Sequence, residues 1–344
     1  MRTFLIVVFA AAIAPSSADS SPNQQLKSSQ LYQYSTQAMG TLVSISVWTD
    51  EEELAAKAAS AAFSEFRRID ALMTSWLETS ELSRLNRSAG TAIEVNEELY
   101  SVISIAQNVA KKSRGAFDIT VGAFKGLWKF GEDKDGTIPK AKDVAARAKR
   151  VNFRRVKLLP KNQIRIEEGT RVTLGGIAKG YGMDRAVKIM HELGLVDFIV
   201  QAGGDMYASG RKGSRSWKLG IRDPRGERSS TFAIAEIQDA TFSTSGDYER
   251  YVVIDGVRYH HILDPKSGWP ARKSRSVTVV TQSGLLADAW STALFVMGPK
   301  KGMKIVKKTN GMEAVFVDAA GKISVSPGLK KRVQILPTQS TLER

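Results

Sequence analysis

The chain has 344 residues, a formal net charge of +15, 42% hydrophobic residues and no cysteine. Without cysteine it can form neither a disulfide framework nor a lipid-modified cysteine anchor, and a cysteine nucleophile is excluded. The basic residues are dispersed among acidic ones, and no zinc-finger or RNA-binding signature accompanies them, so we expect no nucleic-acid partner. The positive charge instead suits anionic ligands or acidic partners.

The first 18 residues are typical of a secretory signal peptide. Arg2 precedes an apolar run from Phe4 to Ile13, and small residues up to Ala18 form a cleavage site. This run is too short to span a membrane, which needs roughly 20 apolar residues. We therefore expect a periplasmic or otherwise exported protein that is soluble, has no transmembrane segment in the mature chain and is not a cysteine-anchored lipoprotein. Residues 19–30 are expected to form a flexible leader, residues 31–337 a single domain and residues 338–344 a tail.

The first half of the chain alternates strand and helix patterns. Tyr32 to Thr49 has the β-branched alternation of a strand, interrupted at Met39-Gly40-Thr41. Asp50 can cap a long amphipathic helix that extends to Trp76. A further helix is predicted from Asn96 to Arg114, and residues 132–150 look polar and irregular.

A glycine-rich stretch from Leu174 to Gly182 leads into a helix that continues to Leu193 and stops at Gly194. Backbone amides at the start of such a helix face an anion. The phosphate-loop pattern does not match, because Tyr181 rather than Ser or Thr follows Gly180, and the glycine spacing is not that of a dinucleotide fingerprint. The stretch alone leaves a phosphate site and a tight helix-packing turn equally open.

The second half is richer in short β-branched segments. Asp255-Gly256, between two of these segments, is a strong hairpin signal. Helices and antiparallel hairpins segregate along the chain, so an α+β fold with mixed or antiparallel sheets and packed helices is favoured. Strands are expected at 155–159, 163–166, 172–174, 196–201, 251–254, 257–262, 274–281, 313–317, 322–325 and 332–336, with helices at 285–296 and 300–309.

Asp288 and Thr292 are candidate metal ligands. Residues four apart on a helix share a face, and a carboxylate with a hydroxyl there suits a hard cation such as Mg²⁺. The alternative is an exposed Asp with a Thr that bonds back to its own helix.

Two of the three histidines, His260 and His261, lie next to each other before the Asp264-Pro265 turn. Neighbours in a strand point to opposite faces, so only one of them can face a pocket and act as a general base. The alternative for that residue is a hydrogen-bonded core histidine. His191, on a helix, is interpreted as structural.

Aromatic and sulfur side chains form a third candidate group. Met39 or Trp76 with Phe117 could sandwich a flat ring, while Asp118 bonds its polar edge. Ordinary core packing is the alternative.

Eight short motifs in this order resemble the FAD:protein FMN transferase (ApbE) family over about Tyr32 to Leu336. They are Ala38-Met-Gly-Thr41, Ser80-Glu-Leu-Ser-Arg-Leu-Asn86, Gly115-Ala-Phe-Asp118, Leu174 to Gly182, Gly203-Gly-Asp205, Ser243-Thr-Ser-Gly246, His261-Ile-Leu-Asp-Pro265 and Ala287-Asp-Ala-Trp-Ser-Thr292.

The resemblance implies a T-fold-like ApbE architecture for residues 31–337 and a Mg²⁺-dependent enzyme. Such an enzyme splits FAD, releases AMP and attaches FMN through a phosphoester to a Thr or Ser of an exported acceptor flavoprotein. It also implies that His261 is the base, with His260 in reserve, and that Asp288 acts in catalysis. The implied metal ligands are Asp288, Thr292 and the backbone oxygen of Ala178, with the Ser291 backbone nearby. The residues implied to hold FAD are Met39, Trp76, Ala116, Phe117, Asp118, Gly175, Tyr181, Ile262 and Leu263, with Lys179 as a secondary phosphate contact.

Two other functions remain open at this point. A FAD pyrophosphatase would use the same metal site with water as the acceptor and yield free FMN and AMP. A flavin-binding protein without turnover would never form AMP. The identity of the acceptor protein and the oligomeric state cannot be predicted from the residues.

Overall fold

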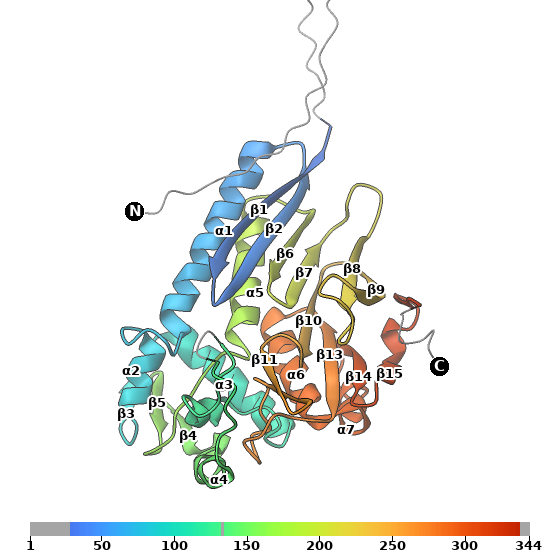
Figure 1. Cartoon of the computed structure of the whole chain (residues 1–344). Coiled ribbons are helices and arrows are strands. Elements are labelled where there is room, and N and C mark those ends of the chain that lie inside the picture. Colours follow the sequence, from blue (N-terminus) through green and yellow to red (C-terminus); the bar gives the residue numbers. More distant parts are fainter. Residues whose placement is uncertain (1–27, 132–133, 338–344) are drawn as a thin grey trace, which may run out of the picture.

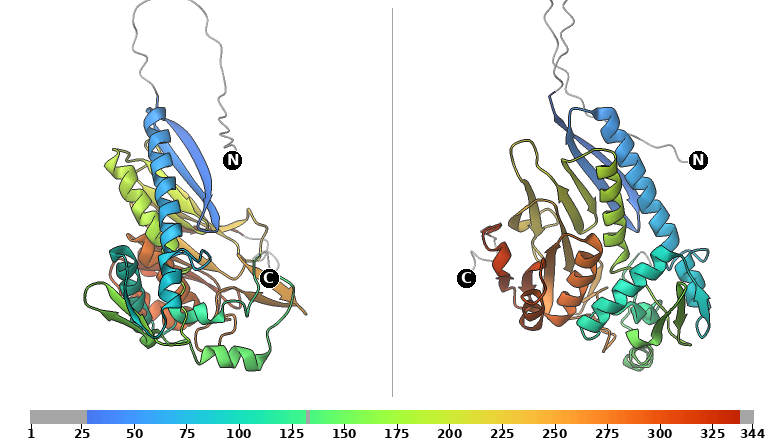
Figure 2. Two further views of the ribbon diagram at one scale, coloured as in Figure 1. Left: turned by 90° about the vertical axis from the view of Figure 1, so that its left-hand side faces the viewer. Right: turned by 180° about the vertical axis from the view of Figure 1, so that it is seen from behind.

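The computed structural model describes residues 28–131 and 134–337. Its centre is an eight-stranded sheet in the order β1-β2-β6-β7-β10-β13-β14-β15, in which every neighbouring pair is antiparallel. The helices α1 and α5 cover one face of its first half (Figures 1 and 2). The strands are β1 Gln30–Ala38, β2 Thr41–Thr49, β6 Phe198–Ala202, β7 Asp205–Ser209, β10 Ala240–Gly246, β13 Ser274–Thr281, β14 Glu313–Asp318 and β15 Ile323–Val325.

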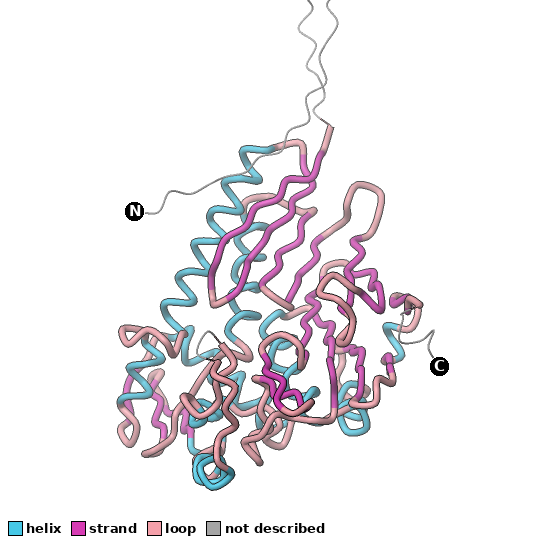
Figure 3. The backbone as a smooth tube through the Cα atoms, viewed as in Figure 1, coloured by secondary structure: helices cyan, strands magenta, loops and turns pink. Residues whose placement is uncertain are grey.

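Three smaller sheets and seven α-helices complete the described fold (Figure 3). The sheets are β3-β5-β4, β16-β9-β8 and the hairpin β11-β12. Their strands are β3 Ala92–Glu94, β4 Val156–Leu159, β5 Gln163–Ile166, β8 Trp217–Arg222, β9 Thr231–Ile237, β11 Tyr251–Ile254, β12 Val257–His260 and β16 Val333–Ile335. The helices are α1 Glu52–Met73, α2 Glu81–Arg87, α3 Glu97–Lys112, α4 Ala141–Ala148, α5 Ala178–Glu192, α6 Gly284–Met297 and α7 Pro299–Val306, with short 3-10 helices at Ile119–Phe124, Phe153–Arg155 and Pro327–Leu329.

Alternate side chains of the strands point into the hydrophobic core. Val43, Ile45 and Val47 of β2 are fully buried under α1 and α5, as are Phe198 and Val200 of β6. Burying a side chain of this size contributes about 1.5–3 kcal/mol, so this face is strongly specified. The second half of the sheet buries residues such as Phe242 against the sheet β16-β9-β8.

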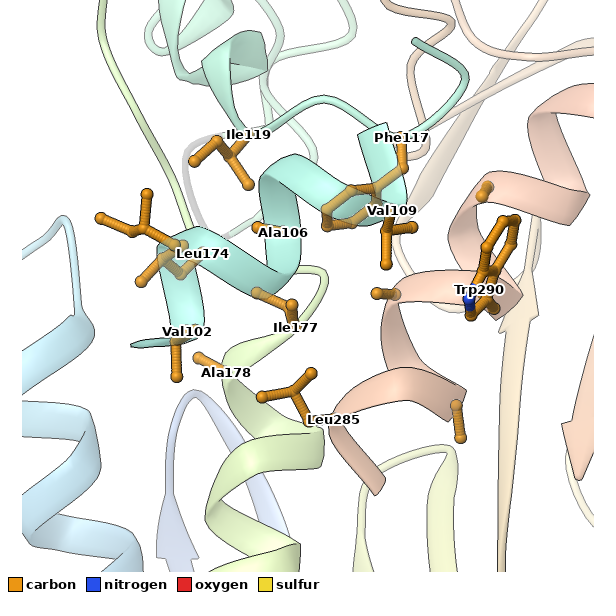
Figure 4. Close-up of a cluster of buried hydrophobic side chains, with 14 of the residues drawn as sticks. Val102, Ala106, Val109, Phe117, Ile119, Leu174, Ile177, Ala178, Leu285 and Trp290 are labelled. Carbon is orange, nitrogen blue, oxygen red and sulfur yellow. The ribbon is translucent and has the colours of Figure 1, made fainter. Parts of the chain in front are cut away.

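A second core holds the helices that carry the candidate site. Figure 4 shows Val102, Ala106 and Val109 of α3 facing Ile177 and Leu285, which lie at the entrances of α5 and α6. The amino-terminal ends of α5 and α6 therefore sit on a rigid, buried support.

The predicted fold class is confirmed, and so is the hairpin turn at Asp255-Gly256. Both turn residues have positive φ angles, 50° and 73°, as a two-residue primed turn requires. The predicted interruption at Met39 is also a hairpin turn, between β1 and β2, and Met39 has a φ of 51°.

Three expectations for individual elements were wrong. The helix expected to reach Trp76 ends at Met73, because Thr74 adopts an extended conformation. Val172 is not in a strand, because the side chain of Asn86 takes up both of its backbone groups, at 2.7 and 3.0 Å. The segment expected to be irregular contains α4, Ala141–Ala148, which buries Val144.

The predicted signal peptide, residues 19–27 of the leader and the tail 338–344 lie outside the described residues. Within the described ranges, no helix is long and apolar enough to cross a membrane.

Candidate active site

The glycine-rich stretch brings α5 and α6 into close contact. A Cβ at Gly180 would lie 2.1 Å from the carbonyl oxygen of Gly284, and one at Gly182 would lie 3.0 Å from the Phe66 ring. These two glycines therefore serve helix packing. Gly176 is less crowded and lies beside Phe117 and the Thr292 hydroxyl, and Gly175 is exposed, so the loop before the helix stays accessible.

Lys179, on the first turn of α5, joins two buried carboxylates from different elements. Its Nζ lies 2.8 Å from Asp205 Oδ2 and 3.1 Å from Asp288 Oδ2. The Gly180 amide also donates to Asp288 Oδ2, at 3.2 Å. Asp205 follows the Gly203-Gly204 turn at the start of β7, and Asp288 lies on the second turn of α6. We call Lys179, Asp205 and Asp288 the acidic centre.

Hydroxyl groups surround the acidic centre. Ser243 Oγ donates to Asp205 Oδ1 at 2.5 Å, and Ser291 Oγ donates to the Asp288 carbonyl oxygen at 2.9 Å. Ser245 Oγ lies 2.8 Å from Ser291 Oγ and 3.3 Å from Thr292 Oγ1. Hydroxyl and carboxylate oxygens from β7, β10 and α6 are thus linked in one network around the acidic centre.

The two carboxylates share a single cation in a buried place. Burial and the neighbouring Asp205 raise the pKa of Asp288 to about 6, although Lys179 and the Gly180 amide act in the opposite direction. Burial alone would lower the pKa of Lys179, but its attraction to Asp205 and Asp288 outweighs burial and raises that pKa. The acidic centre therefore carries one more negative than positive charge when all three groups are ionised.

The donor set fits a hard divalent cation. Asp205 Oδ2 is buried and accepts no hydrogen bond of good geometry, although Lys179 lies close to it. Carboxylate, hydroxyl and carbonyl oxygens are the ligands that Mg²⁺ prefers. Within residues 28–131 and 134–337, no group of three or more His, Asp or Glu side chains is arranged to hold a metal, so a cation here depends on hydroxyl and backbone oxygens as well. Ala178 is the first residue of α5, two positions before Gly180.

The two neighbouring histidines have different environments. His260 is 3% exposed, and its Nε2 lies 2.8 Å from the Ala271 carbonyl oxygen, while its Nδ1 accepts from the Ile262 amide at 3.3 Å. His261 is exposed to solvent. Desolvation by the surrounding protein, then the neighbouring His260, Arg250 and Lys179, lower the pKa of His261. His261 is thus the more accessible of the two, and its place facing a pocket stays a prediction.

Met39, Phe117 and Trp76 are placed differently around the entrance of α5. The Met39 sulfur lies against Gly182, and the Phe117 ring lies against Gly176. Trp76 is 75% exposed, and the Lys125 ammonium lies 4.3 Å from the centre of its ring. Of these three side chains, Trp76 is open to solvent, Met39 is half-buried and Phe117 is buried.

Asp118 already has partners for both carboxylate oxygens. Oδ1 accepts from the amide and the hydroxyl of Thr120, at 2.8 and 2.6 Å, and Oδ2 accepts from the Phe153 amide at 2.7 Å. Burial raises the pKa of Asp118. Its side chain caps the 3-10 helix Ile119–Phe124, so any contact between a ligand and the Ala116 to Asp118 segment would use the backbone.

The remaining residues singled out in the sequence have partners of their own. Tyr181 donates to Glu98 Oε1 at 2.6 Å. The Ile262 carbonyl accepts from the Ala271 amide at 2.9 Å, and Leu263 pairs with Pro270 in an isolated bridge. His191 contacts the Leu195 carbonyl oxygen at 3.1 Å and the Phe198 ring, which agrees with the structural interpretation.

Sequence reasoning did not assign Asp205, Ser243 or Ser245 to the site. All three stand in short motifs that had been noticed, Gly203-Gly-Asp205 and Ser243-Thr-Ser-Gly246. Their convergence depends on the register of β7 against β10, which pairs Asp205 with Ser243.

Fold and site together define an α+β enzyme with a buried acidic centre. The ApbE family profile matches residues 39–316. The FAD:protein FMN transferase of Treponema pallidum is 32% identical over 89% of this chain and 90% of its own length, and a Klebsiella pneumoniae protein of the same name is 29% identical over 90% of each chain. An ApbE protein from Thermotoga maritima superposes with a TM-score of 0.80 at 35% identity, and the flavin transferase ApbE from Vibrio cholerae with 0.79 at 26%; each alignment covers 88% of this chain and 99% of the other. The chain therefore belongs to the ApbE family, and it is a transferase.

Proposed function

We propose that the chain transfers FMN from FAD to a Thr or Ser hydroxyl of an exported acceptor flavoprotein, in a Mg²⁺-dependent reaction that releases AMP. The observation that carries this proposal is the acidic centre, where two buried carboxylates share one lysine. The names of the curated relatives support FAD as the substrate.

Mg²⁺ would be held by Asp288, Thr292 and the Ala178 carbonyl, with the Ser291 backbone nearby, and Asp205 is added here as a second carboxylate within reach. When bound, the ion neutralises the charge that builds up on the pyrophosphate during phosphoryl transfer. Lys179 also provides positive charge at the same place, and the exposed loop at Gly175 leaves room for the phosphates.

The flavin part of FAD is assigned to the entrance of α5. Met39 and the exposed Trp76 would offer sulfur and aromatic surface to a flat ring, and Phe117, whose side chain is buried, would contact the ring only after a local rearrangement. The backbone of Ala116 to Asp118 and of Ile262 to Leu263 would hold its polar edges. Tyr181 is assigned to the same pocket from the side of α5.

His261 is assigned as the base. The acceptor oxygen forms a bond to the phosphorus of the FMN half, the bond from that phosphorus to the AMP oxygen breaks, and the hydroxyl proton moves to His261. A neutral imidazole is needed for this step, and desolvation, with a smaller contribution from the neighbouring charges, lowers the pKa of His261 and so favours the neutral form. His260 is buried and its ring nitrogens face backbone groups, so it remains the reserve.

The test is to incubate the protein with FAD, MgCl₂ and an exported acceptor flavoprotein domain, and to measure AMP, free FMN and covalently bound FMN. We expect AMP and bound FMN in equal amounts. AMP with free FMN alone would identify a pyrophosphatase, and FAD binding without AMP would identify a flavin-binding protein. His261→Ala should keep its affinity for FAD and lose transfer, and full transfer by this variant would remove His261 from the mechanism.

A further inference from the structure

The hairpin β11-β12, which is followed directly by His261, projects from the body of the protein, as the orange strands in the left view of Figure 2 show. It pairs with no other sheet among the described residues, so both of its strands are edges. Free edges are usually blunted or covered, because their backbone groups can bind another chain.

The register shows which backbone groups of β11 point outward. Ile254 pairs with Val257 across the two-residue turn, and the His261 amide donates to the Arg250 carbonyl at 3.1 Å. Because hydrogen-bonded and non-bonded pairs alternate in an antiparallel ladder, Tyr251 and Val253 direct their N–H and C=O groups away from β12. The side chains of these two residues are also exposed, by 39% and 56%.

Three arginines in or next to this hairpin have no carboxylate partner. The Arg258 guanidinium lies 3.9 Å from the centre of the Tyr251 ring, and Arg272 lies 5.4 Å from that of Tyr259. Arg250 donates to the Gly40 carbonyl at 2.9 Å. Among the described residues none of the three forms a salt bridge; Glu249, next to Arg250, pairs with Arg222 instead. Arg258 Nη1 is buried and has no hydrogen-bond partner.

We infer that β11 is the docking edge for the acceptor: an extended, acidic segment of the acceptor protein adds as a strand to Tyr251 and Val253, and the three arginines attract its charge. This inference rests on the proposed transfer to a protein hydroxyl. Main-chain hydrogen bonds along an edge strand give affinity, and alternate side chains give specificity.

The position of the edge suits delivery of a hydroxyl. β11 begins directly after Arg250, whose carbonyl is bonded to the amide of His261. A docked strand lies two strand spacings, roughly 10 Å, from the line of β12, a distance that about three extended residues cross. The target Thr or Ser is therefore expected within a few residues of the docked segment. The chain between them would pass Arg250.

A pair of substitutions at one position isolates the backbone contact. Val253→Pro removes an N–H that β12 does not use, while Val253→Thr keeps that N–H and suits a strand. The probe is a synthetic peptide with one Thr, β-branched neighbours and Asp or Glu on both sides; a second probe carries Lys in place of the acids. The full chain is used with FAD and MgCl₂.

We expect Val253→Pro to raise the KM for the acidic peptide roughly tenfold with little change in kcat, and Val253→Thr to stay within about twofold. Arg258→Glu should raise the KM for the acidic peptide by at least as much and should lower the KM for the lysine peptide. FAD affinity should be unchanged in all three variants, which also shows that they fold. Equal behaviour of Val253→Pro and Val253→Thr would overturn the inference.

Amide exchange separates docking from transfer. Binding of the acidic peptide should slow exchange at Tyr251 and Val253 even where no FMN is transferred. Slowed exchange without covalent FMN would refute the proposed transfer but support β11 as the docking edge. Transfer without slowed exchange at these amides would support the transfer and refute β11 as the docking edge. A loss of FAD affinity in Arg258→Glu would assign the arginines to FAD, and peptide-independent dimers that Val253→Pro breaks would assign the edge to a second copy of the chain.

Discussion

Two clusters of charged side chains each include one residue of α5 and differ in their charge balance. The acidic centre has two carboxylates and one lysine. In the other cluster, Arg68 pairs with Glu65 and Glu98 and Arg185 pairs with Glu65, at 2.6 to 2.9 Å, which makes two cations for two carboxylates. We call these four residues the helix ion network. Tyr181 adds a hydroxyl to Glu98.

The pKa values of the acids follow this balance. Hydrogen bonds from Arg68, with help from Arg185, lower the pKa of Glu65 to about 2, whereas burial raises the pKa of Asp288 to about 6. A balanced network is satisfied by its own members and needs no ligand. A buried cluster with an excess negative charge destabilises the fold, and a bound cation can reduce this destabilisation. Groups with such perturbed pKa values are found at functional sites.

The largest effect is expected at the acidic centre. Asp288→Asn should lower the rate of FMN transfer about a thousandfold, because it would remove both the proposed ligand of the cation and the charge that attracts it. Glu65→Gln, in the helix ion network, should stay within about threefold. The rates of AMP release by the two variants provide the comparison, and a similar loss in both would show that the clusters do not differ in function.

Replacement of Lys179 tests how much the buried negative charge destabilises the fold. Lys179→Met leaves Asp205 and Asp288 buried without a cation and should reduce the free energy of unfolding by about 3 kcal/mol. Added Mg²⁺ should restore part of this loss, because it replaces the missing positive charge. Urea unfolding with and without Mg²⁺ measures both, and Arg68→Met, whose side chain is 44% exposed, is the control, with a loss of about 1 kcal/mol and no response to Mg²⁺.

The helix ion network predicts a dependence of stability on pH. Glu65 has a pKa lowered from 4.5 to about 2, so its contribution is complete above about pH 4.5 and is lost as the pH falls toward 2. After solvent screening at the exposed arginines, this contribution is about 1–2 kcal/mol. Unfolding of the native protein and of Glu65→Gln should differ by this amount at pH 6 and converge near pH 2. A constant difference would place the effect outside the ion pairs.

Tyr181→Phe gives the smallest expected change. It removes the hydrogen bond to Glu98, but Glu98 still accepts a hydrogen bond from Arg68. The free energy of unfolding should therefore fall by about 1 kcal/mol. FAD affinity should stay within about twofold if the ring alone contacts the flavin. A large loss of affinity, measured by flavin fluorescence, would mean that the hydroxyl turns toward FAD when it binds.

Much of the fold could be predicted from local patterns. The strand Ser274–Thr281 and the turn at Asp255-Gly256 are both predicted from local sequence, and both are confirmed. The strands β7 to β10 were not predicted. For β10 the reason is that its segment Ala-Thr-Phe-Ser-Thr-Ser-Gly consists mostly of small and polar residues. Such a strand is stabilised by its neighbours in the sheet rather than by its own composition.

The candidate site was predicted only in part, for a related reason. Asp288 and Thr292 share a helix face that spacing reveals, but Asp205 and Ser243 are 38 residues apart and meet only through the pairing of β7 with β10. The packing role of Gly180 likewise depends on the approach of Gly284 from α6. These contacts depend on the pairing of segments far apart in the chain, which a single sequence does not reveal.

The most direct test of the acidic centre is a calorimetric titration of the native protein, Asp288→Asn and Glu65→Gln with MgCl₂ in the presence of FAD. The excess negative charge at the acidic centre predicts saturable binding of Mg²⁺ to the native protein and to Glu65→Gln, and its loss in Asp288→Asn. Equal binding of Mg²⁺ to all three proteins would contradict this account, because the cation would then be held elsewhere.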